Sequence, residues 1–386
     1  MIKRSVTEKV ISLSGQYPVV TITGPRQSGK TTLCKNLFKD KAYFSLENLN
    51  TRQYAQSDPV GFLNECVIHG AVIDEIQRVP DLLSYIQGIV DNKKQNGLFI
   101  LTGSQNFQLM SGISQSLAGR TALVTLLPFS YEEVYKNKRI DIPQLLYKGF
   151  YPRIFDQNLN PYDALSFYVS TYLERDVRSI LEVRNLNTFE IFLKLCSART
   201  GQILNLSSLG NDCGLAHNTV KQWINVLETS HIIFLLRPHF KNFSKRLIKS
   251  PKLYFTDVGL ACYLLEIENQ KQIQNHPLKG SLFETFVVAE LLKKRFNAGK
   301  KGNLFYFRDN IGKEVDIIID KGLEQIPVEV KSGQTIHSEL FKNINYYYRL
   351  NRTSENKGIL IYGGSEKQKR TLYQVVPYPH ISDINL

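Results

Sequence analysis

One stretch near the amino end constrains the fold of this chain more than any other. Residues 18–38 read PVVTITGPRQSGKTTLCKNLF, in which a β-branched apolar run leads into a loop and then a helix-compatible segment. The loop matches the pattern GxxxxGK[ST] through Gly24, Gly29, Lys30 and Thr31. Glycines at this spacing let backbone N–H groups close around phosphate oxygens, and the helix N-terminus adds its positive dipole end. The stretch therefore predicts a phosphate-binding loop in an α/β sheet.

The polar side chains of this loop have separate roles in binding a nucleoside triphosphate. The Lys30 ammonium group is expected to reach the β- and γ-phosphates, and the Thr31 hydroxyl group is expected to ligate Mg²⁺. Thr32, the next residue along the chain, is a further candidate contact for the nucleotide.

Two more apolar runs end in polar residues. GAVIDEIQRVP, at residues 70–80, reads as a strand that ends in Asp74 and Glu75. An acid at this place holds Mg²⁺ through water, and a second acid can polarise the attacking water. GLFILTGSQN, at residues 97–106, places Ser104 and Asn106 to sense the γ-phosphate or the water, although either is equally well explained as a turn residue. Because ligands bind at the carboxyl edge of open α/β sheets, these groups should meet the loop.

The segments GPRQSGKT, VIDEIQ, LTGSQN and LAGRTALVTLLPFS together resemble the AAA+ superfamily. More closely, the chain resembles a family of prokaryotic ATPases whose C-terminal half is a domain of unknown function, and the resemblance covers nearly its whole length. It implies an ATP-hydrolysing, parallel-sheet α/β core at residues 1–127 and a homo-oligomer, such as a hexamer, with active sites between subunits. An arginine finger acts across such an interface. Arg120 is the first candidate and Arg175 the second, and the sequence separates neither from a structural salt bridge.

Helical periodicity dominates the middle of the chain. Residues 128–190 carry apolar residues at i, i+3 and i+4 spacing, with Pro161 suited to a helix start, and predict a lid-like helical segment. Residues 191–268 predict a winged helix, in which a second helix begins near Asn218 or Thr219 and a strand pair follows. Such a helix lies in the major groove of DNA, although many winged helices bind proteins instead.

Basic and polar residues in the predicted winged helix are placed for DNA contact. The candidates on the second helix are His217, Asn218, Lys221 and Gln222. The following hairpin has six cations and no acidic residue, namely Arg237, Lys241, Lys245, Arg246, Lys249 and Lys252. This pattern predicts a wing that follows DNA phosphates, or a solvated charged face. With 48 Lys and Arg against 35 Asp and Glu, the net charge of +13 also favours nucleic acid or an anionic membrane surface as partner.

Charged residues interrupt two apolar runs near the C-terminus. EVDIIIDKGLEQIPVEVK, at residues 314–331, reads as a strand, a turn and a strand, yet Asp316, Glu329 and Lys331 lie within the runs. Residues i and i+2 share a strand face, so Glu329 and Lys331 point the same way. Facing carboxylates repel unless a cation lies between them, and hard oxygen ligands suit Mg²⁺ or Mn²⁺. A paired Asp and Lys on an exposed sheet face is the alternative.

This arrangement resembles the PD-(D/E)XK nuclease superfamily, with Asp316 as the first acid and Glu329-Val330-Lys331 as the E-x-K element. Glu284, on a predicted amphipathic helix over residues 280–296, matches a further acid of many members, while Val315 replaces the name-giving proline. The resemblance implies that residues 269–386 form a restriction-endonuclease-like α/β domain. In that family the acids bind metal and the lysine assists attack of water on a phosphodiester. Such domains also occur as DNA-binding platforms that do not cut.

Together these patterns predict a protein that hydrolyses ATP and binds or remodels DNA, with metal-dependent cleavage left open. The alternative is a signalling switch in which ATP governs a protein–protein contact, the winged helix docks a protein and the C-terminal fold is inactive. The five cysteines show no zinc-like spacing and predict free thiols in a reducing compartment. No signal-peptide core is visible and no apolar run approaches the ~18 residues of a membrane span, so we expect a cytoplasmic protein without a membrane partner.

Overall fold

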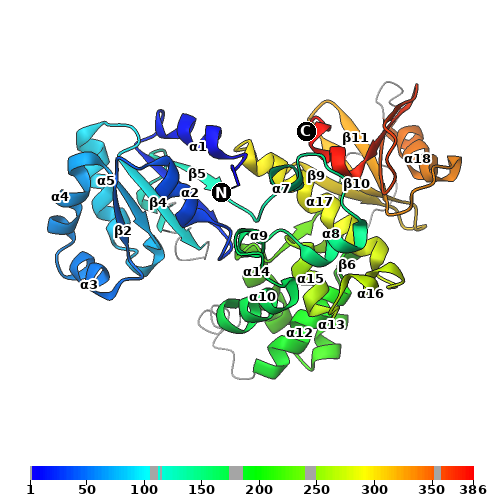
Figure 1. Ribbon diagram of the computed structural model, residues 1–386, viewed down its shortest axis with the longest axis horizontal. Helices are drawn as coiled ribbons and strands as arrows, with labels where there is room; N and C mark the ends of the chain where they lie inside the picture. The colour runs from blue at the N-terminus through cyan, green and yellow to red at the C-terminus, as the bar shows by residue number, and fades with distance from the viewer. Residues whose placement is uncertain (1, 105–111, 114, 174–185, 240–248, 352–357) are drawn as a thin grey trace. The chain divides into compact units, whose positions relative to one another are not determined.

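The computed structural model describes residues 2–104, 112–113, 115–173, 186–239, 249–351 and 358–386. The chain divides into two compact units (Figure 1). The first unit consists of Met1–Phe129 with Thr229–His231 and Phe296–Lys300, and the second consists of Ser130–Glu228, Ile232–Arg295 and Lys301–Leu386.

A parallel five-stranded sheet forms the centre of the first unit, in the order β2-β3-β4-β1-β5. Its strands are β1 (Val19–Gly24), β2 (Ala42–Ser45), β3 (Ala71–Asp74), β4 (Phe99–Ser104) and β5 (Thr121–Thr125). The helices of this unit are α1 (Thr7–Ser14), α2 (Lys30–Leu37), α3 (Leu49–Ser57), α4 (Pro59–His69) and α5 (Leu82–Lys93), with a 3-10 turn η1 (Ile76–Arg78).

Side chains that alternate along these strands build two core layers. Val19 of β1 packs in the layer with α3, α4 and α5, whereas Val20 and Ile22 pack in the layer with α1 and α2. A parallel sheet covered on both faces explains why its strands are near-continuous apolar runs. The predicted α/β parallel sheet is confirmed, and β1, β3 and β4 end at one edge with Gly24, Asp74 and Ser104.

Short helices open the second unit. They are α7 (Tyr131–Tyr135), α8 (Ile142–Lys148), α9 (Pro152–Asp156) and α10 (Pro161–Tyr168), followed by a π-helical turn η2 (Val169–Leu173). Helix α7 starts with a capping box, in which Ser130 and Glu133 each satisfy the backbone N–H group of the other. Helix α10 begins at Pro161, as predicted, after the side chain of Asn160 accepts a hydrogen bond from the Tyr162 N–H group.

Three helices and a small sheet come next along the chain. They are α12 (Leu186–Ala198), β6 (Gln202–Ile203), α13 (Leu206–Cys213), α14 (His217–Thr229), β7 (Ile233–Leu236) and β8 (Lys252–Phe255), with the sheet order β6-β8-β7. Helix α12 crosses the predicted boundary between residues 190 and 191, because its apolar periodicity begins before that point. Helix α14 begins at His217, one residue before the predicted start, and buries Val220, Trp223 and Leu227.

A mixed six-stranded sheet completes the second unit, in the order β13-β14-β12-β11-β10-β9. Strands β9, β10 and β11 pair antiparallel, while β11, β12 and β14 pair in parallel. The strands are β9 (Leu304–Arg308), β10 (Glu314–Asp320), β11 (Gln325–Lys331), β12 (Gly358–Tyr362), β13 (Gln368–Lys369) and β14 (Tyr373–Pro377). The helical elements are α15 (Val258–Leu264), α16 (Gln270–Gln274), α17 (Lys279–Asn297) and α18 (Lys342–Asn351), with 3-10 turns η3 (Ser338–Phe341) and η4 (Tyr378–Asp383).

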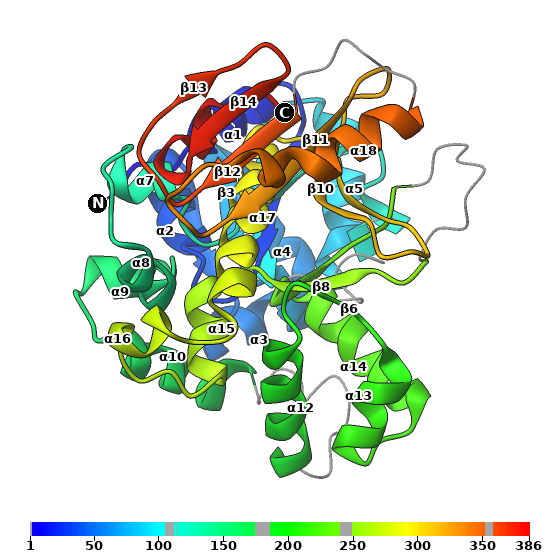
Figure 2. The same cartoon turned by 90° about the vertical axis from the view of Figure 1, so that its right-hand side faces the viewer.

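The long helix α17 is buried on all sides, which corrects the predicted amphipathic helix. Nearly every residue from Leu282 to Lys293 is buried, because other parts of the unit pack around the helix. Figure 2 shows α17 between the helices α12, α13 and α14 (green) and the mixed sheet (orange and red). No helix in the described part of the chain combines the length and apolarity that crossing a membrane requires.

Candidate functional site

The loop after β1 has the backbone of a phosphate cradle. Gly24 has a φ of +148°, and a Cβ atom there would collide with the carbonyl oxygen of Leu126. Gly29 has a φ of +91°, which places it in the left-handed region that favours glycine. Helix α2 begins at the next residue, Lys30, so the free N–H groups of its first turn adjoin the loop.

The Lys30 ammonium group is folded onto the loop that carries it. Its Nζ atom donates to the carbonyl oxygens of Gly24 at 3.0 Å and Pro25 at 2.8 Å, and the residue is 5% exposed. Burial lowers the pKa of Lys30, while the carboxyl groups of Glu75 and Asp74 oppose the decrease. Phosphate oxygens would be stronger, charge-assisted acceptors for this ammonium group than the two carbonyls.

Asp74, the last residue of β3, accepts hydrogen bonds from three hydroxyl groups. Oδ2 accepts from Thr31 Oγ1 at 2.9 Å and from the Tyr43 hydroxyl at 2.6 Å, and Oδ1 accepts from Thr102 Oγ1. The two residues predicted to hold Mg²⁺, Thr31 and Asp74, are thus in direct contact. Sequence reasoning missed Thr102, although it is a polar residue in the same strand as Ser104, and nothing in the sequence marks Tyr43.

Glu75 follows the strand end with left-handed backbone geometry, at a φ of +61°. The Gln77 side-chain amide donates both to the Glu75 carboxyl group and, at 2.9 Å, to Ser104 Oγ. Burial raises the pKa of Glu75, and the nearby Lys30 opposes the rise. Gln77, which the sequence did not single out, therefore joins the predicted water-polarising acid to the predicted sensor.

The Arg4 side chain forms hydrogen bonds with the backbone of the phosphate loop and of the segment that follows β5. Its Nη1 atom donates to the carbonyl oxygen of Ser28 at 2.8 Å, and Nη2 donates to that of Leu127 at 2.6 Å. The buried guanidinium group also lies over the Phe129 ring, 4.8 Å from its centroid. These contacts tie the loop to the segment that follows β5. Sequence reasoning missed Arg4, because a single basic residue outside the loop motif gives no spacing signal.

The other candidates of the first unit lie apart from this cluster. Thr32 is exposed on α2. Arg120 forms a bidentate ion pair with Asp91, at 2.6 Å for Nε and 2.8 Å for Nη2. Because Arg120 directly precedes β5, it lies at the amino edge of the sheet, opposite the loop. Within a single chain, the Arg120 side chain is engaged by this ion pair with Asp91. The role of arginine finger stays a prediction. Asn106 and Arg175 lie outside the described residues.

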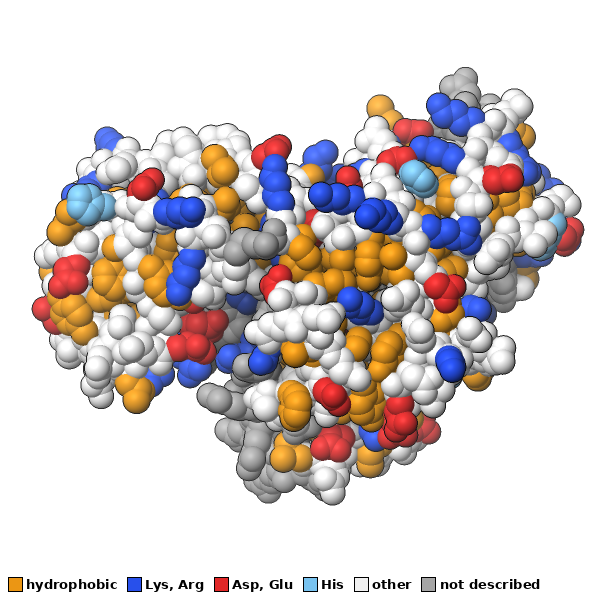
Figure 3. Space-filling model, in the orientation of Figure 1, with side chains coloured by type: hydrophobic (Ala, Val, Ile, Leu, Met, Phe, Trp, Pro, Cys, Tyr) orange, Lys and Arg blue, Asp and Glu red, His pale blue; other side chains and the backbone are white. Residues whose placement is uncertain are grey.

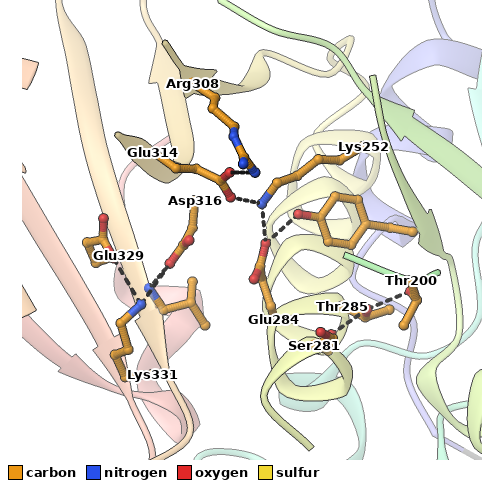
Figure 4. A network of polar contacts seen from close by, with 12 residues as sticks. Thr200, Lys252, Ser281, Glu284, Thr285, Arg308, Glu314, Asp316, Glu329 and Lys331 are labelled. Atoms are coloured by element: carbon orange, nitrogen blue, oxygen red, sulfur yellow. Dashed lines mark hydrogen bonds and ion pairs between the residues drawn. The ribbon is translucent and has the colours of Figure 1, made fainter. Parts of the chain in front are cut away.

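In the second unit, β10 and β11 bring together three residues that the sequence singled out (Figure 4). Asp316 and Glu329 are buried, and Lys331 Nζ lies 3.3 Å from Asp316 Oδ2 and 3.0 Å from Glu329 Oε2. Asp316 Oδ2 also accepts the Val330 N–H group at 2.8 Å. One ammonium group therefore bridges the two predicted metal ligands.

Glu284, the predicted further acid, lies near Asp316 but has other partners. Its Oε1 atom accepts from Lys252 Nζ at 3.0 Å and from the Tyr254 hydroxyl group. Burial raises the pKa of Glu284, and the charge of Asp316 adds to the rise.

A fourth acid, Glu314, was missed by sequence reasoning. Its carboxyl group lies 2.5 Å from Lys252 Nζ and 2.9 Å from Arg308 Nη1. Glu314 and Asp316 are two residues apart in β10, and this spacing on one strand face could have revealed it. Within the described residues, no group of three or more His, Cys, Asp or Glu is arranged to hold a metal ion. The metal-binding roles of Asp316 and Glu329 stay predictions.

The base of the predicted wing is anchored to the C-terminal sheet. The Tyr306 N–H group donates to the Arg237 carbonyl at 3.0 Å, and the His239 N–H group donates to the Tyr306 carbonyl at 2.8 Å. The Tyr306 hydroxyl group donates to the Ser250 carbonyl. Lys252 is buried among acids, so it is not a surface wing cation as predicted. Three further predicted wing cations, Lys241, Lys245 and Arg246, lie outside the described residues.

Helix α14 presents its predicted DNA-contacting residues to solvent. His217, Asn218, Lys221 and Gln222 are all exposed. The first carboxylate along this helix is Glu228, near its C-terminal end. On the face shown in Figure 3, Lys and Arg side chains are spread over both units with Asp and Glu among them. The net positive charge is therefore not gathered into one patch on that face.

A glycine-containing loop between β1 and α2, with an Asp-Glu pair at the end of β3 in a parallel sheet, defines a P-loop ATPase-like fold. Residues 16–135 match a family model described as "AAA domain". Residues 139–271 match "Domain of unknown function (DUF8612)", and residues 279–381 match "Domain of unknown function (DUF4143)". The chain thus contains an AAA domain, followed by two domains of unknown function.

Two curated relatives have similar sequences. The uncharacterized proteins Rv2008c of Mycobacterium tuberculosis and Mb2031c of Mycobacterium bovis are each 29% identical over 324 residues. The match covers 82% of this chain and 71% of each relative.

Three solved structures show a distant likeness to this chain. The Walker-type ATPase PABY2304 of Pyrococcus abyssi is 13% identical, with 68% of this chain and 96% of that chain covered and a TM-score of 0.44. AMPPCP-bound DnaA from Aquifex aeolicus is 19% identical, with 58% and 85% covered and a TM-score of 0.31. The RuvB Holliday junction branch migration motor of Thermotoga maritima is 14% identical, with 61% and 90% covered and a TM-score of 0.28.

Proposed function

We propose that this protein binds ATP with Mg²⁺ at the loop after β1, hydrolyses it, and uses this cycle to bind or remodel DNA. The observation that carries the proposal is the meeting of three sheet segments at one edge. There Thr31 donates to Asp74, and Gln77 joins Glu75 to Ser104. These are the groups that hydrolysis of a nucleoside triphosphate needs.

Binding of the triphosphate would redirect groups that are already in place. The Lys30 ammonium group, now on two carbonyl oxygens, would move to the β- and γ-phosphates, and the Gly24–Gly29 loop would supply N–H donors. The residues fit Mg²⁺, because Thr31 and Asp74 place a hydroxyl and a carboxylate oxygen side by side. When bound, Mg²⁺ neutralises charge that develops on the phosphate oxygens.

Glu75 is the proposed acceptor for a proton of the attacking water. Its carboxyl group is held by the Gln77 amide, so its position is fixed relative to Ser104 at the end of the neighbouring strand. Ser104, in register with Gly24, is the proposed group that detects the γ-phosphate. We further propose a homo-oligomer. In it, the Arg120 side chain would leave Asp91 and contact the phosphates of the ATP that a neighbouring subunit binds.

The contact with DNA is proposed for α14. The order of α12, β6, α13, α14, β7 and β8 is the order expected for a winged helix, and α14 holds Asn218 and Lys221 on its exposed face. Cleavage of DNA at the C-terminal acids is not part of the proposal, because those carboxylates already form ion pairs with Lys252 and Lys331.

ATP turnover in the presence and absence of DNA tests the proposal. We expect hydrolysis by the wild type to rise severalfold with single-stranded, duplex or four-way DNA. Lys30→Ala should abolish nucleotide binding, and Glu75→Gln should retain binding but stop turnover. Lys39→Ala, at an exposed lysine two residues after the end of α2, is the matched control. Wild-type turnover by Lys30→Ala would place the ATP site elsewhere, and a rate unchanged by DNA would favour the signalling switch.

A second measurement addresses the proposed DNA surface. Lys221→Ala should weaken binding to every duplex and reduce the slope of log K against log salt by about 1. Lys271→Ala, at an exposed lysine on α16, should leave both unchanged. Equal effects of the two substitutions would remove α14 from the interface.

A further inference from the structure

Two lysine side chains, not one, hold the acids at the centre of the second unit. Lys331 pairs with Asp316 and Glu329, and Lys252 pairs with Glu284 at 3.0 Å and Glu314 at 2.5 Å (Figure 4). Lys331 comes from the predicted E-x-K element. Lys252 comes from β8, in the small sheet that belongs to the predicted winged helix.

Lys252 is enclosed as a charged group. The residue is 2% exposed, and its Nζ atom also lies 5.7 Å from the centroid of the Tyr306 ring. Burial by itself lowers the pKa of Lys252, but Tyr254, Glu284 and Glu314 outweigh this effect and raise the pKa well above its ordinary value. A buried ammonium group is tolerated only with such close counter-charges. Lys252 therefore neutralises the cluster in the way that a bound cation would.

The acids as arranged do not fit a divalent metal ion. Mg²⁺ requires near-octahedral oxygen ligands, and any carboxylate oxygen that a lysine already holds is lost to it. Asp316 Oδ2 accepts from Val330 and Lys331, and Glu284 Oε1 accepts from Lys252 and Tyr254. Glu329 Oε1 has no hydrogen-bond partner among the described residues, but the other oxygen atom of this carboxylate, Oε2, is held by Lys331 at 3.0 Å.

The strand that delivers Lys252 is fixed in place independently of the ion pairs. Tyr306 of β9 exchanges backbone hydrogen bonds with Arg237 and His239, and its hydroxyl group donates to Ser250, two residues before Lys252. His239 also lies 3.5 Å from Asp320 of β10. The position of Lys252 is therefore fixed by the contacts of Tyr306 with the segments that follow β7 and precede β8.

We propose that Lys252 is the resident cation of this acidic cluster and takes the place that a divalent metal ion would otherwise fill. In consequence, the C-terminal domain holds its acids together without metal and does not cleave phosphodiesters through them. The same ammonium group links β8 to α17 and β10, so it fastens the predicted winged helix to the C-terminal sheet.

Binding of Mn²⁺ to the nucleotide-free, full-length protein tests the proposal, with free Mn²⁺ followed by electron paramagnetic resonance. Wild type and Asp316→Asn should bind Mn²⁺ equally, since the acids take none while Lys252 is present. Lys252→Met should gain about one Mn²⁺ per chain, and Lys252→Met with Glu284→Gln should lose it again. Lys249→Met, at an exposed lysine three residues earlier, should behave as wild type.

Thermal unfolding gives a second readout that does not depend on activity. Without metal, Lys252→Met should unfold at a lower temperature than Lys249→Met, and Mn²⁺ should raise its midpoint selectively. A wild-type Mn²⁺ site that disappears in Asp316→Asn would overturn the proposal. So would a folded Lys252→Met protein that gains no Mn²⁺ site. If Lys252→Met does not fold, the comparison of wild type with Asp316→Asn decides, because only a loss of Mn²⁺ there contradicts the proposal.

Discussion

The Thr31 hydroxyl group donates a 2.9 Å hydrogen bond to Asp74 Oδ2, across 43 residues of sequence. This contact joins the first residues of α2 to the end of β3, which is two strands away from β1 in the sheet. Since the Tyr43 hydroxyl group donates to the same oxygen atom, the carboxylate is oriented before any ligand arrives. The site is therefore largely preformed on rigid elements, which limits the ordering that nucleotide binding must impose.

Thr31→Val tests the proposed role of that hydroxyl group. Valine keeps the shape but removes both the hydrogen bond and the oxygen ligand, so ATP affinity with Mg²⁺ should fall at least tenfold, about 1.4 kcal/mol. Affinity without Mg²⁺ should change little, and Thr31→Ser should behave as wild type. Titration of a fluorescent ATP analogue with and without Mg²⁺ measures both. Equal losses in the two conditions would show that the hydroxyl group acts on the fold and not on the metal.

The pH dependence of turnover should report Glu75. A proton acceptor must be ionised, and burial raises the pKa of Glu75 above its ordinary value of 4.5. As pH rises through this raised pKa, Glu75 loses its proton and kcat should increase. The acid limb of kcat against pH should therefore lie above pH 4.5, while ATP binding stays constant over the same range. An acid limb at or below the ordinary glutamate value would remove Glu75 from the role of base.

Thiol reactivity should distinguish one cysteine from the other four. All five cysteines are free, as predicted, and only Cys213 is partly exposed. Burial raises the pKa of the Cys66 thiol to about 12 and also raises those of Cys34, Cys196 and Cys262. Burial raises the pKa of Cys213 too, so its partial exposure is what sets it apart, and an aromatic disulfide reagent should modify one group quickly and four only on unfolding. Cys213→Ser should lack the fast phase. A second thiol that reacts fast would show that at least one of the four buried cysteines is accessible to the reagent in the folded protein.

The sequence predicted the arrangement of the phosphate loop and the neighbouring strand ends because the signals for them are local. Gly24, Gly29 and Lys30 have a fixed spacing within one loop. The rule that parallel strands share a carboxyl edge placed Asp74 and Ser104 beside them. Arg4 and Tyr43 contribute through contacts that depend on the folded chain, so no spacing marks them.

The C-terminal acids show the opposite case. Strand alternation correctly placed Glu329 and Lys331 beside Asp316, but Lys252 was interpreted as a surface cation because it ends a basic hairpin. Its true partners, Glu284 and Glu314, lie 32 and 62 residues away in sequence, and only tertiary packing brings them to it. Charge patterning counts cations but does not show which of them are buried. For the same reason α17 was expected to have a polar face, since its burial comes from elements of the unit that are distant from it in sequence.

Arg4 offers a test of how the back of the phosphate loop affects the nucleotide. Arg4→Met keeps much of the apolar contact with Phe129 but removes the donors to Ser28 and Leu127, each worth about 1.5–3 kcal/mol for a charged group. We expect at least a tenfold loss of ATP affinity together with a lower unfolding temperature. Arg4→Lys should recover only part of both, because one ammonium group lacks the fork that reaches two carbonyls. Lys3→Met, at the neighbouring exposed cation, controls for charge. If Arg4→Met lowers stability but binds ATP as wild type does, Arg4 supports the fold alone and does not position the loop.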